Sequence, residues 1–356
     1  LAAIDYVLPA HVETLILTGT ALLGLGNAGD NRLVGTAGDN RLEGLGGDDT
    51  LQGLDGPDTL IGGPGFDVAS YAALGKPVRV DLRTGFAEQA DGATDTLVGI
   101  EALIGTGRAD SLAGDDAANA VTGGDGDDTL EGFGGNDTLA GGAGDDVLAG
   151  GDGADSLSGG AGSDTASYAG STTGVSIDLA AGLADDGDSL SGIENLEGSP
   201  QADTLRGDDS GNRLIGSAGG DRLDGAGGFD IVDYLASPVG VAIDLAAPTG
   251  TAGFADGDSY ARVEGAVGSS HADTIEGDEA GNALSGGSGD DALIGRAGDD
   301  TLRGDAGADT LAGGGGANRL EGGAGNDVYV VTSDSDTIVE TGGEGRDRVD
   351  SALDSI

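Results

Sequence analysis

The sequence has no cysteine, no methionine and no tryptophan, and only 6 Tyr and 5 Phe among its 356 residues. The absence of cysteine excludes disulfide bonds, cysteine nucleophiles and cysteine-based metal sites. So few aromatic side chains argue against a thick aromatic core. No run of 18 apolar residues is present, so no membrane-spanning helix is encoded. The sequence starts at Leu1 without a basic segment followed by an apolar one, so we expect no secretory signal peptide, and a chain that does not begin with Met is expected to be a fragment.

Positive charge is also scarce, because 15 Lys and Arg stand against 64 Asp and Glu, which gives a formal net charge of −49. Binding to nucleic acid or to an acidic membrane surface needs clustered Lys and Arg. The composition therefore predicts no nucleic-acid partner and no membrane insertion. A cationic partner is expected instead.

Catalytic motifs are missing as well. The two histidines, His11 and His271, lie in no H-E-x-x-H motif, and no G-x-S-x-G motif is flanked by a strand and a helix. We expect both histidines on surface loops. Carboxylates are abundant, but they follow the repeat described next and give no separate sign of a glycosidase pair. We predict that this chain is not an enzyme.

What the sequence does contain is glycine, at 75 residues, and a nine-residue repeat. From Gly26 the chain reads GNAGDNRLV, GTAGDNRLE and GLGGDDTLQ, and the same pattern returns in later blocks. There are 23 units, which together fill more than half of the chain. They form four blocks, at residues 26–70, 105–167, 198–233 and 268–330.

Each position of the unit predicts a role. Glycine at positions one and four is expected to supply backbone with positive φ and so allow a tight loop. Asp at position six offers the hard carboxylate oxygen that Ca²⁺ prefers. Leu, Ile or Val at position eight is expected to point to the other side and stack in the core.

The pattern G-G-x-G-x-D-x-U-x resembles the RTX (repeats-in-toxin) family of calcium-binding nonapeptide repeats. The resemblance implies an all-β fold, a right-handed parallel β-roll or β-solenoid with stacked Ca²⁺-binding Gly/Asp loops. The first six positions of each unit turn and bind Ca²⁺, the last three form a short strand, and two units complete one coil.

The position-six aspartates are the predicted metal ligands. They are Asp49, Asp58, Asp67, Asp110, Asp128, Asp137, Asp146, Asp155, Asp164, Asp203, Asp221, Asp230, Asp273, Asp291, Asp300, Asp309 and Asp327. An ion between stacked loops should contact aspartates that lie two units apart, and nine such pairs exist, the first being Asp49 with Asp67. Asn replaces Asp in some units, often the first or second of a block, and we expect weaker or empty sites and a capping coil there. The Asn positions are Asn31, Asn40, Asn119, Asn212, Asn282 and Asn318.

Energetics make calcium a structural cofactor in this interpretation. Ordering nine residues costs about 13 kcal/mol at about 1.5 kcal/mol per residue. One buried Leu returns only about 1.5 to 3 kcal/mol. Calcium neutralises the carboxylates, and its binding free energy becomes folding free energy. We therefore expect multiple structural Ca²⁺ ions and a disordered chain without them.

Three longer segments separate the blocks and share a tyrosine, an alternating VxVDL-type strand and an I-E or V-E pair. We expect the solenoid to continue through them as two wider β-coils each, with Tyr71, Tyr168 and Tyr234 covering the core; the alternative is that they separate independent β-rolls. The predicted division is 1–25 (N-terminal strand segment), 26–70, 71–104 (insertion 1), 105–167, 168–197 (insertion 2), 198–233, 234–267 (insertion 3), 268–330 and 331–356 (C-terminal strand segment).

The ends suggest assembly, because LAAIDYV at residues 1–7 is similar to DSALDSI at residues 350–356. The chain is then one period of a longer array or a subunit that stacks head to tail. We predict a structural or adhesive region of a large secreted surface or matrix protein, with calcium, itself or cell-surface components as partners. The alternative is the secretion and folding module of an exported enzyme or toxin. By resemblance, the location is extracellular or at the cell surface, reached by the Gram-negative type I route.

Overall fold

The fold is known from a computed structural model, which describes residues 4–184, 187–247, 249–340 and 345–351. Most of the similarity between the two chain ends lies outside these residues. Within them every regular element is a β-strand, apart from one 3₁₀ turn, η1 (Gly253–Ala255). No helix in this part of the chain is long and apolar enough to cross a membrane. The chain divides into two compact units, residues 1–167 with 186–193, and residues 168–185 with 194–356.

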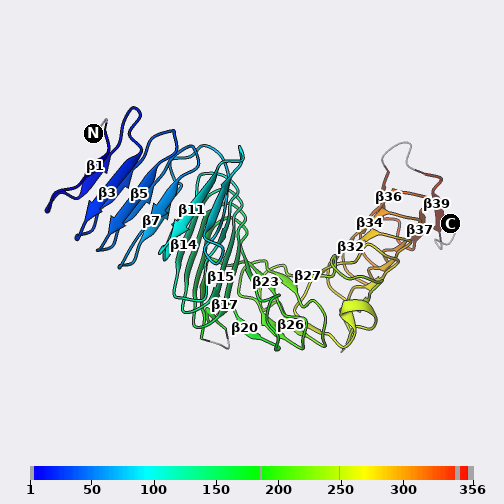
Figure 1. Cartoon of the computed structure of the whole chain (residues 1–356). Coiled ribbons are helices and arrows are strands. Elements are labelled where there is room, and N and C mark those ends of the chain that lie inside the picture. Colours follow the sequence, from blue (N-terminus) through cyan, green and yellow to red (C-terminus); the bar gives the residue numbers. More distant parts are fainter. Residues whose placement is uncertain (1–3, 185–186, 248, 341–344, 352–356) are drawn as a thin grey trace. The chain divides into compact units, whose positions relative to one another are not determined.

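The first unit is a ladder of short strands in two sheets, which Figure 1 draws from blue to green. One sheet follows the order β1 (Tyr6–Val7), β3 (Leu23–Asn27), β5 (Arg41–Leu45), β7 (Thr59–Ile61), β11 (Thr94–Val98), β10 (Phe86–Gln89), β9 (Val78–Asp81), β13 (Ser111–Ala113), β15 (Thr129–Gly134), β17 (Val147–Asp152), β19 (Thr165–Ser167). The other follows β2 (Thr14–Ile16), β4 (Arg32–Val34), β6 (Thr50–Gln52), β8 (Val68–Ser70), β12 (Ala102–Ile104), β14 (Ala120–Asp125), β16 (Thr138–Ala143), β18 (Ser156–Ala161), β22 (Ser189–Ser191).

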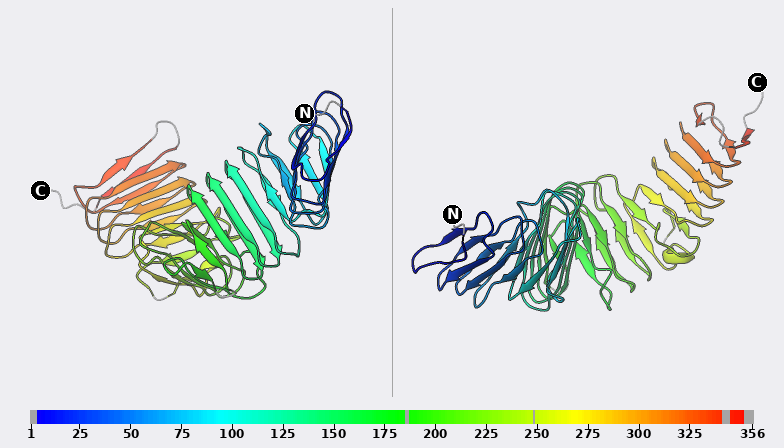
Figure 2. Two further views of the ribbon diagram at one scale, coloured as in Figure 1. Left: turned by 90° about the vertical axis from the view of Figure 1, so that its left-hand side faces the viewer. Right: turned by 45° about the horizontal axis from the view of Figure 1, so that its top comes forward.

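The second unit repeats this plan, and its strands also run side by side in both views of Figure 2. One sheet contains β23 (Asn195–Glu197), β25 (Arg213–Ile215), β27 (Ile231–Asp233), β30 (Gly265–Val267), β32 (Ala283–Ser288), β34 (Thr301–Ala306), β36 (Arg319–Ala324) and β38 (Thr337–Val339). A second contains β21 (Leu183–Ala184), β20 (Ser176–Asp178), β24 (Thr204–Arg206), β26 (Arg222–Asp224) and β29 (Ser259–Ala261). A third contains β28 (Ala242–Asp244), β31 (Thr274–Glu276), β33 (Ala292–Ile294), β35 (Thr310–Ala312), β37 (Val328–Val331) and β39 (Arg348–Ser351).

The register within the blocks is one full coil, which corresponds to two repeat units. Leu130 pairs with Leu148 in one sheet, and Leu139 pairs with Leu157 in the other. These position-eight side chains are at most 1 % exposed and form the core between the sheets. The predicted parallel β-solenoid is confirmed, and the core is a stack of single aliphatic side chains from each strand.

The solenoid continues through insertion 1, but not as two full coils. β12 stacks directly on β8, so one sheet gains a single strand. The other sheet gains three, because β9, β10 and β11 form an antiparallel meander between β7 and β13. The prediction of two wider coils is wrong here, because part of the added length folds back as a hairpin. The three insertion tyrosines Tyr71, Tyr168 and Tyr234 are buried, as expected.

Candidate metal centres

All 17 predicted ligands lie in the loops between the short strands, and all are buried. None is more than 5 % exposed. A buried carboxylate needs a partner for its charge or for its oxygens, since an uncompensated one is strongly unfavourable. The question for these loops is therefore which groups satisfy each carboxylate oxygen.

One oxygen of most position-six aspartates belongs to a ladder along the stack. The backbone N–H of Asp128 donates to Oδ1 of Asp146 at 2.8 Å, and that of Asp146 donates to Asp164 at 2.9 Å. Each of the nine predicted pairs is joined by the same bond, over 2.7–2.9 Å. The predicted stacking of aspartates is thus confirmed.

The other oxygen, Oδ2, is buried without a hydrogen-bond partner in many loops. These orphaned oxygens belong to Asp49, Asp58, Asp67, Asp128, Asp137, Asp146, Asp221, Asp230, Asp291, Asp300, Asp309 and Asp327. A buried charged acceptor without a donor is costly, and such an atom points to a missing cation or proton.

The orphaned oxygens lie against the position-one glycines. A Cβ built on Gly132 would lie 2.2 Å from Oδ2 of Asp137 and 2.5 Å from the carbonyl oxygen of Gly150, one coil further on. Carboxylate and carbonyl oxygens therefore converge on the same Cα. Position one needs glycine for this space; the expectation that it needs a positive φ is wrong, because Gly132 is not among the positive-φ residues.

Positive φ occurs instead at positions two and four. Gly142 and Gly144 have φ of 121° and 136°, and a Cβ on either would lie within 2.3 Å of a carbonyl oxygen of the preceding coil, from Gly124 or Gly126. Seven non-glycine residues at position two share this strained backbone, which L side chains rarely adopt. They are Leu45, Leu54, Phe133, Ser217, Ala226, Arg296 and Asp305.

Burial also changes the proton affinity of these carboxyl groups. It raises the pKa of Asp128, Asp221 and Asp291 to about 7, and neighbouring carboxylates add to the effect. Burial raises the pKa of Asp58 to about 8 in the same way. In the absence of a cation the loops therefore hold protons that an exposed Asp would have lost.

The donor set fits Ca²⁺. Buried carboxylate oxygens and backbone carbonyls are the hard oxygen ligands that this ion takes, six to eight at a time, in flexible geometry. The residues that would hold it are the position-six aspartates with orphaned Oδ2 atoms, together with the carbonyls of positions one, two and four. Bound there, the ion would neutralise carboxylates that otherwise face one another through the stack.

Three predicted ligands differ from the rest. Oδ2 of Asp110, Asp203 and Asp273 accepts a hydrogen bond from the backbone N–H of the position-two residue, at 2.5–2.7 Å. Oδ1 of each of these side chains accepts a hydrogen bond from the backbone N–H of a residue in the preceding insertion; for Asp110 the donor is Val78. These carboxylates are satisfied by the protein alone.

The sequence analysis missed acidic residues that carry the ladder through the insertions. Asp95, Asp188 and Asp258 are fully buried, and their Oδ1 atoms accept the backbone N–H of Asp58, Asp155 and Asp221. Each begins a D-x-L or D-x-Y triplet, the same signal as positions six to eight, which could have identified them.

The C-terminal end holds a further acidic group. Ligand oxygens of Asp327, Glu340 and Asp347 all lie within 4.8 Å of one another. Asp347 accepts the backbone N–H of Asp327, so it extends the ladder with a spacing of 20 residues, which is longer than two repeat units. Glu340 accepts a hydrogen bond from the hydroxyl of Tyr329.

Comparison with known proteins agrees with this geometry. The family described as RTX calcium-binding nonapeptide repeat (4 copies) matches residues 25–60, 52–69, 95–130, 104–139, 131–166, 191–232, 267–302 and 303–338, which together cover more than half of the chain. A search of curated proteins gives no match. Solved structures that match include an extracellular lipase, LipA, from Serratia marcescens, at 16 % identity and a TM-score of 0.20. The match covers 63 % of this chain and 33 % of the lipase, so this chain spans about a third of that protein.

Proposed function

The chain belongs to the RTX calcium-binding nonapeptide repeat family, and from this premise we propose that it is a structural region of a large secreted bacterial surface or matrix protein that folds when it binds Ca²⁺ outside the cell. The single observation that carries the calcium-coupled part is the column of orphaned, buried Oδ2 atoms. In a chain with net charge −49, stacking these buried carboxylates without a cation is energetically unfavourable.

A low affinity for Ca²⁺ would restrict folding to the extracellular space. Extracellular calcium modules bind in the range of about 10⁻⁴ to 10⁻³ M. Sites of that affinity stay empty in the cytosol and fill outside, so the chain is exported unfolded and folds on arrival. The absence of cysteine agrees with this route, because no disulfide is needed for stability.

A structural or adhesive role is supported by the large share of the chain that the repeats occupy. Repeats fill more than half of it, and their recurring residues are accounted for by turns, cation ligands and core. We propose no catalytic activity for this region. An exported enzyme or toxin that uses these coils as its folding module is the second possibility, and a catalytic domain encoded beside this region in the full gene would favour it.

Head-to-tail association is part of the proposal. β1 and β39 are the outermost described strands of their sheets, and such edges recruit further strands. Within these strands, Val7 and Val349 are 56 % and 53 % exposed. A translational contact between two unlike ends propagates as a filament when it does not close.

Small-angle scattering tests the proposal. In EGTA we expect the radius of gyration of an expanded chain, and in millimolar CaCl₂ a smaller radius per chain and a particle mass that grows with protein concentration. Magnesium should substitute poorly, because it demands strict octahedral geometry and keeps its waters. A compact particle in EGTA would contradict calcium-coupled folding, and a calcium-loaded monomer at high concentration would contradict the assembly.

A further inference from the structure

The 23 loops fall into two classes that differ in the backbone at position two. In 15 of them, called open loops here, position two has a φ between 69° and 126°. In the other eight, called closed loops, the position-two N–H donates to the position-six side chain at 2.5–2.8 Å. The closed loops begin at Gly26, Gly35, Gly105, Gly114, Gly198, Gly207, Gly268 and Gly277. These are the first two units, and hence the first coil, of all four blocks.

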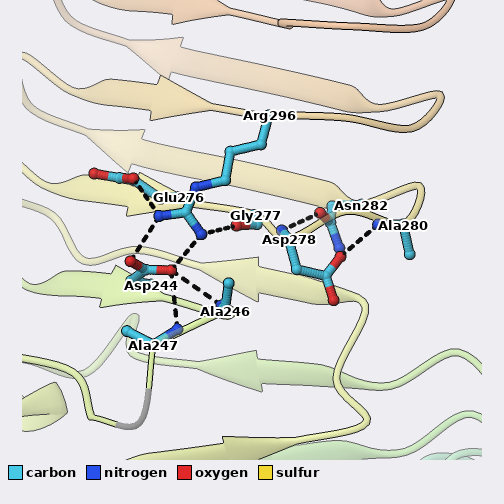
Figure 3. Close-up of polar contacts among 9 residues, drawn as sticks. All are labelled: Asp244, Ala246, Ala247, Glu276, Gly277, Asp278, Ala280, Asn282 and Arg296. Carbon is cyan, nitrogen blue, oxygen red and sulfur yellow. Dashed lines mark hydrogen bonds and ion pairs between the residues drawn. The ribbon is translucent and has the colours of Figure 1, made fainter.

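A second hydrogen bond recurs in every closed loop. The side chain at position two accepts the backbone N–H of position four, over 2.7–3.2 Å. Figure 3 shows one example, in which Asp278 donates its N–H to Asn282 and accepts the N–H of Ala280. Such Asx- and Ser/Thr-type turns replace the positive-φ backbone of the open loops.

The closed loops are also bonded to the segment that precedes each block. In the second closed loop, Nδ2 of Asn119 donates to the carbonyl of Glu101 at 3.2 Å, and Asn212 and Asn282 do the same to Glu194 and Glu264. Aspartate could not make this bond, since an ionised carboxylate is only an acceptor. Asn at position six of this loop therefore contributes a hydrogen bond that Asp could not make, in addition to carrying one negative charge fewer.

The residue at position four enforces the closed form in three blocks. Almost all open loops have a φ of 100° or more at position four, as at Gly126 and Gly135, and this is backbone that favours glycine. The closed loops of blocks two to four carry another residue there: Arg108, Ala117, Gln201, Ser210, His271 and Ala280. A polar residue at position two is not sufficient alone, because Ser217 has φ 69° in a loop whose position four is Gly219.

We propose that the first coil of each block is a calcium-independent cap, and that in blocks two to four the residues at positions two and four decide whether a loop takes Ca²⁺. In a closed loop, hydrogen bonds from the protein occupy the position-six oxygen that the ion would need. Calcium then binds only in the open loops, and Asp110, Asp203 and Asp273 are not ligands despite their place in the repeat. This inference rests on calcium binding by the open loops.

The number of Ca²⁺ ions bound at saturation tests this proposal. A residue that only stabilises the fold changes the calcium concentration at the folding midpoint, whereas a ligand also changes the number of ions bound. Native mass spectrometry of the calcium-loaded chain is the readout. Asp110→Asn should keep the wild-type count, whereas the matched variant Asp128→Asn, one coil further in the same stack, should lose at least one ion. A loss of ions by Asp110→Asn equal to that of Asp128→Asn would overturn the proposal.

A gain-of-site variant covers the case in which Asp110→Asn fails to fold. Thr106→Gly combined with Arg108→Gly gives this loop the glycines of an open one and keeps Asp110. The count should rise by at least one ion, and an unchanged count would overturn the role of positions two and four. If the wild-type chain itself binds no Ca²⁺, the proposed function fails, and that outcome is separate from both variant results.

Discussion

The first coil of each block and the coils that follow it use the same nine-residue unit but satisfy their buried oxygens differently. In the first coil, Asp110 receives hydrogen bonds from Thr106 and Val78. One coil later Asp128 has one oxygen in the ladder and the other without a donor. The comparison shows that the repeat motif defines the coil but does not by itself determine how each position-six carboxylate is satisfied.

The largest expected effect tests whether the two kinds of coil share one core. Leu112, in a closed unit, pairs with Val80 and Leu130, and Leu139, in an open unit, pairs with Val121 and Leu157. Both are at most 1 % exposed. Leu112→Ala and Leu139→Ala should each cost about 2–5 kcal/mol of unfolding free energy in saturating calcium. Denaturant titration measures this, and a cost confined to Leu139→Ala would mean that the first coil is not part of the cooperative core.

The next effect compares a substitution in an open loop with one in a closed loop. Asp146 stands in two stacked pairs and has an orphaned Oδ2. Asp146→Ala removes a proposed ligand and leaves the Asp128 N–H without its acceptor, a loss of about 1–3 kcal/mol before the ion is counted. Asp115→Ala removes one turn hydrogen bond in a closed loop, worth about 0.5–1.5 kcal/mol. The calcium midpoint, followed by circular dichroism, should rise more for Asp146→Ala; equal midpoints would remove the support for position six.

Position-one glycine offers a steric test of the open loop. Gly132→Ala places a methyl group against the Asp137 carboxylate, at a cost of about 1–3 kcal/mol for overpacking. Gly134, two residues on, is the matched control, because the nearest atom to its Cβ would be 3.6 Å away. The thermal unfolding temperature in calcium should therefore fall for Gly132→Ala and stay close to wild type for Gly134→Ala. A larger fall for Gly134→Ala than for Gly132→Ala would contradict the approach of the Asp137 and Gly150 oxygens to Gly132.

The smallest effect is a pH dependence without calcium. Burial raises the pKa of Asp58 to about 8 and that of Asp49 to about 6, against 3.8 for the ordinary group. Between about pH 4 and 8 the folded state therefore binds more protons than the unfolded chain, so stability of the cation-free fold falls as pH rises through this range. In EGTA we expect some β structure to appear as pH is lowered from 8 toward 5. Loss of structure on acidification over that range would contradict the burial of neutral carboxyl groups.

Sequence reasoning predicts the repeated part of this fold well. The nine-residue period fixes the coil length, and the fixed positions six and eight place carboxylates in the loops and aliphatic side chains in the core between the sheets, as at Asp128 and Leu130. The ladder that joins aspartates two units apart follows from the same arithmetic. Periodicity suffices here because every coil has the same neighbours.

What the sequence could not predict depends on contacts between coils. The positive φ of Leu45 and Phe133 has no local signal, because L side chains of these types rarely adopt such backbone. Position-one glycine is explained by the approach of a carboxylate and a carbonyl from another coil, which no local pattern reveals. The meander of β9, β10 and β11 was missed because strand order within an insertion is set by tertiary pairing.

Calcium-coupled folding is tested most directly by far-UV circular dichroism of the whole chain titrated with CaCl₂ from EGTA, at pH 7.5 and low ionic strength. Without calcium the orphaned carboxylates and the net charge of −49 should leave the chain disordered. Calcium in the range of about 10⁻⁴ to 10⁻³ M should then produce a cooperative change to β structure. Full β content in EGTA would contradict the account, because the stacked loops would then need no cation.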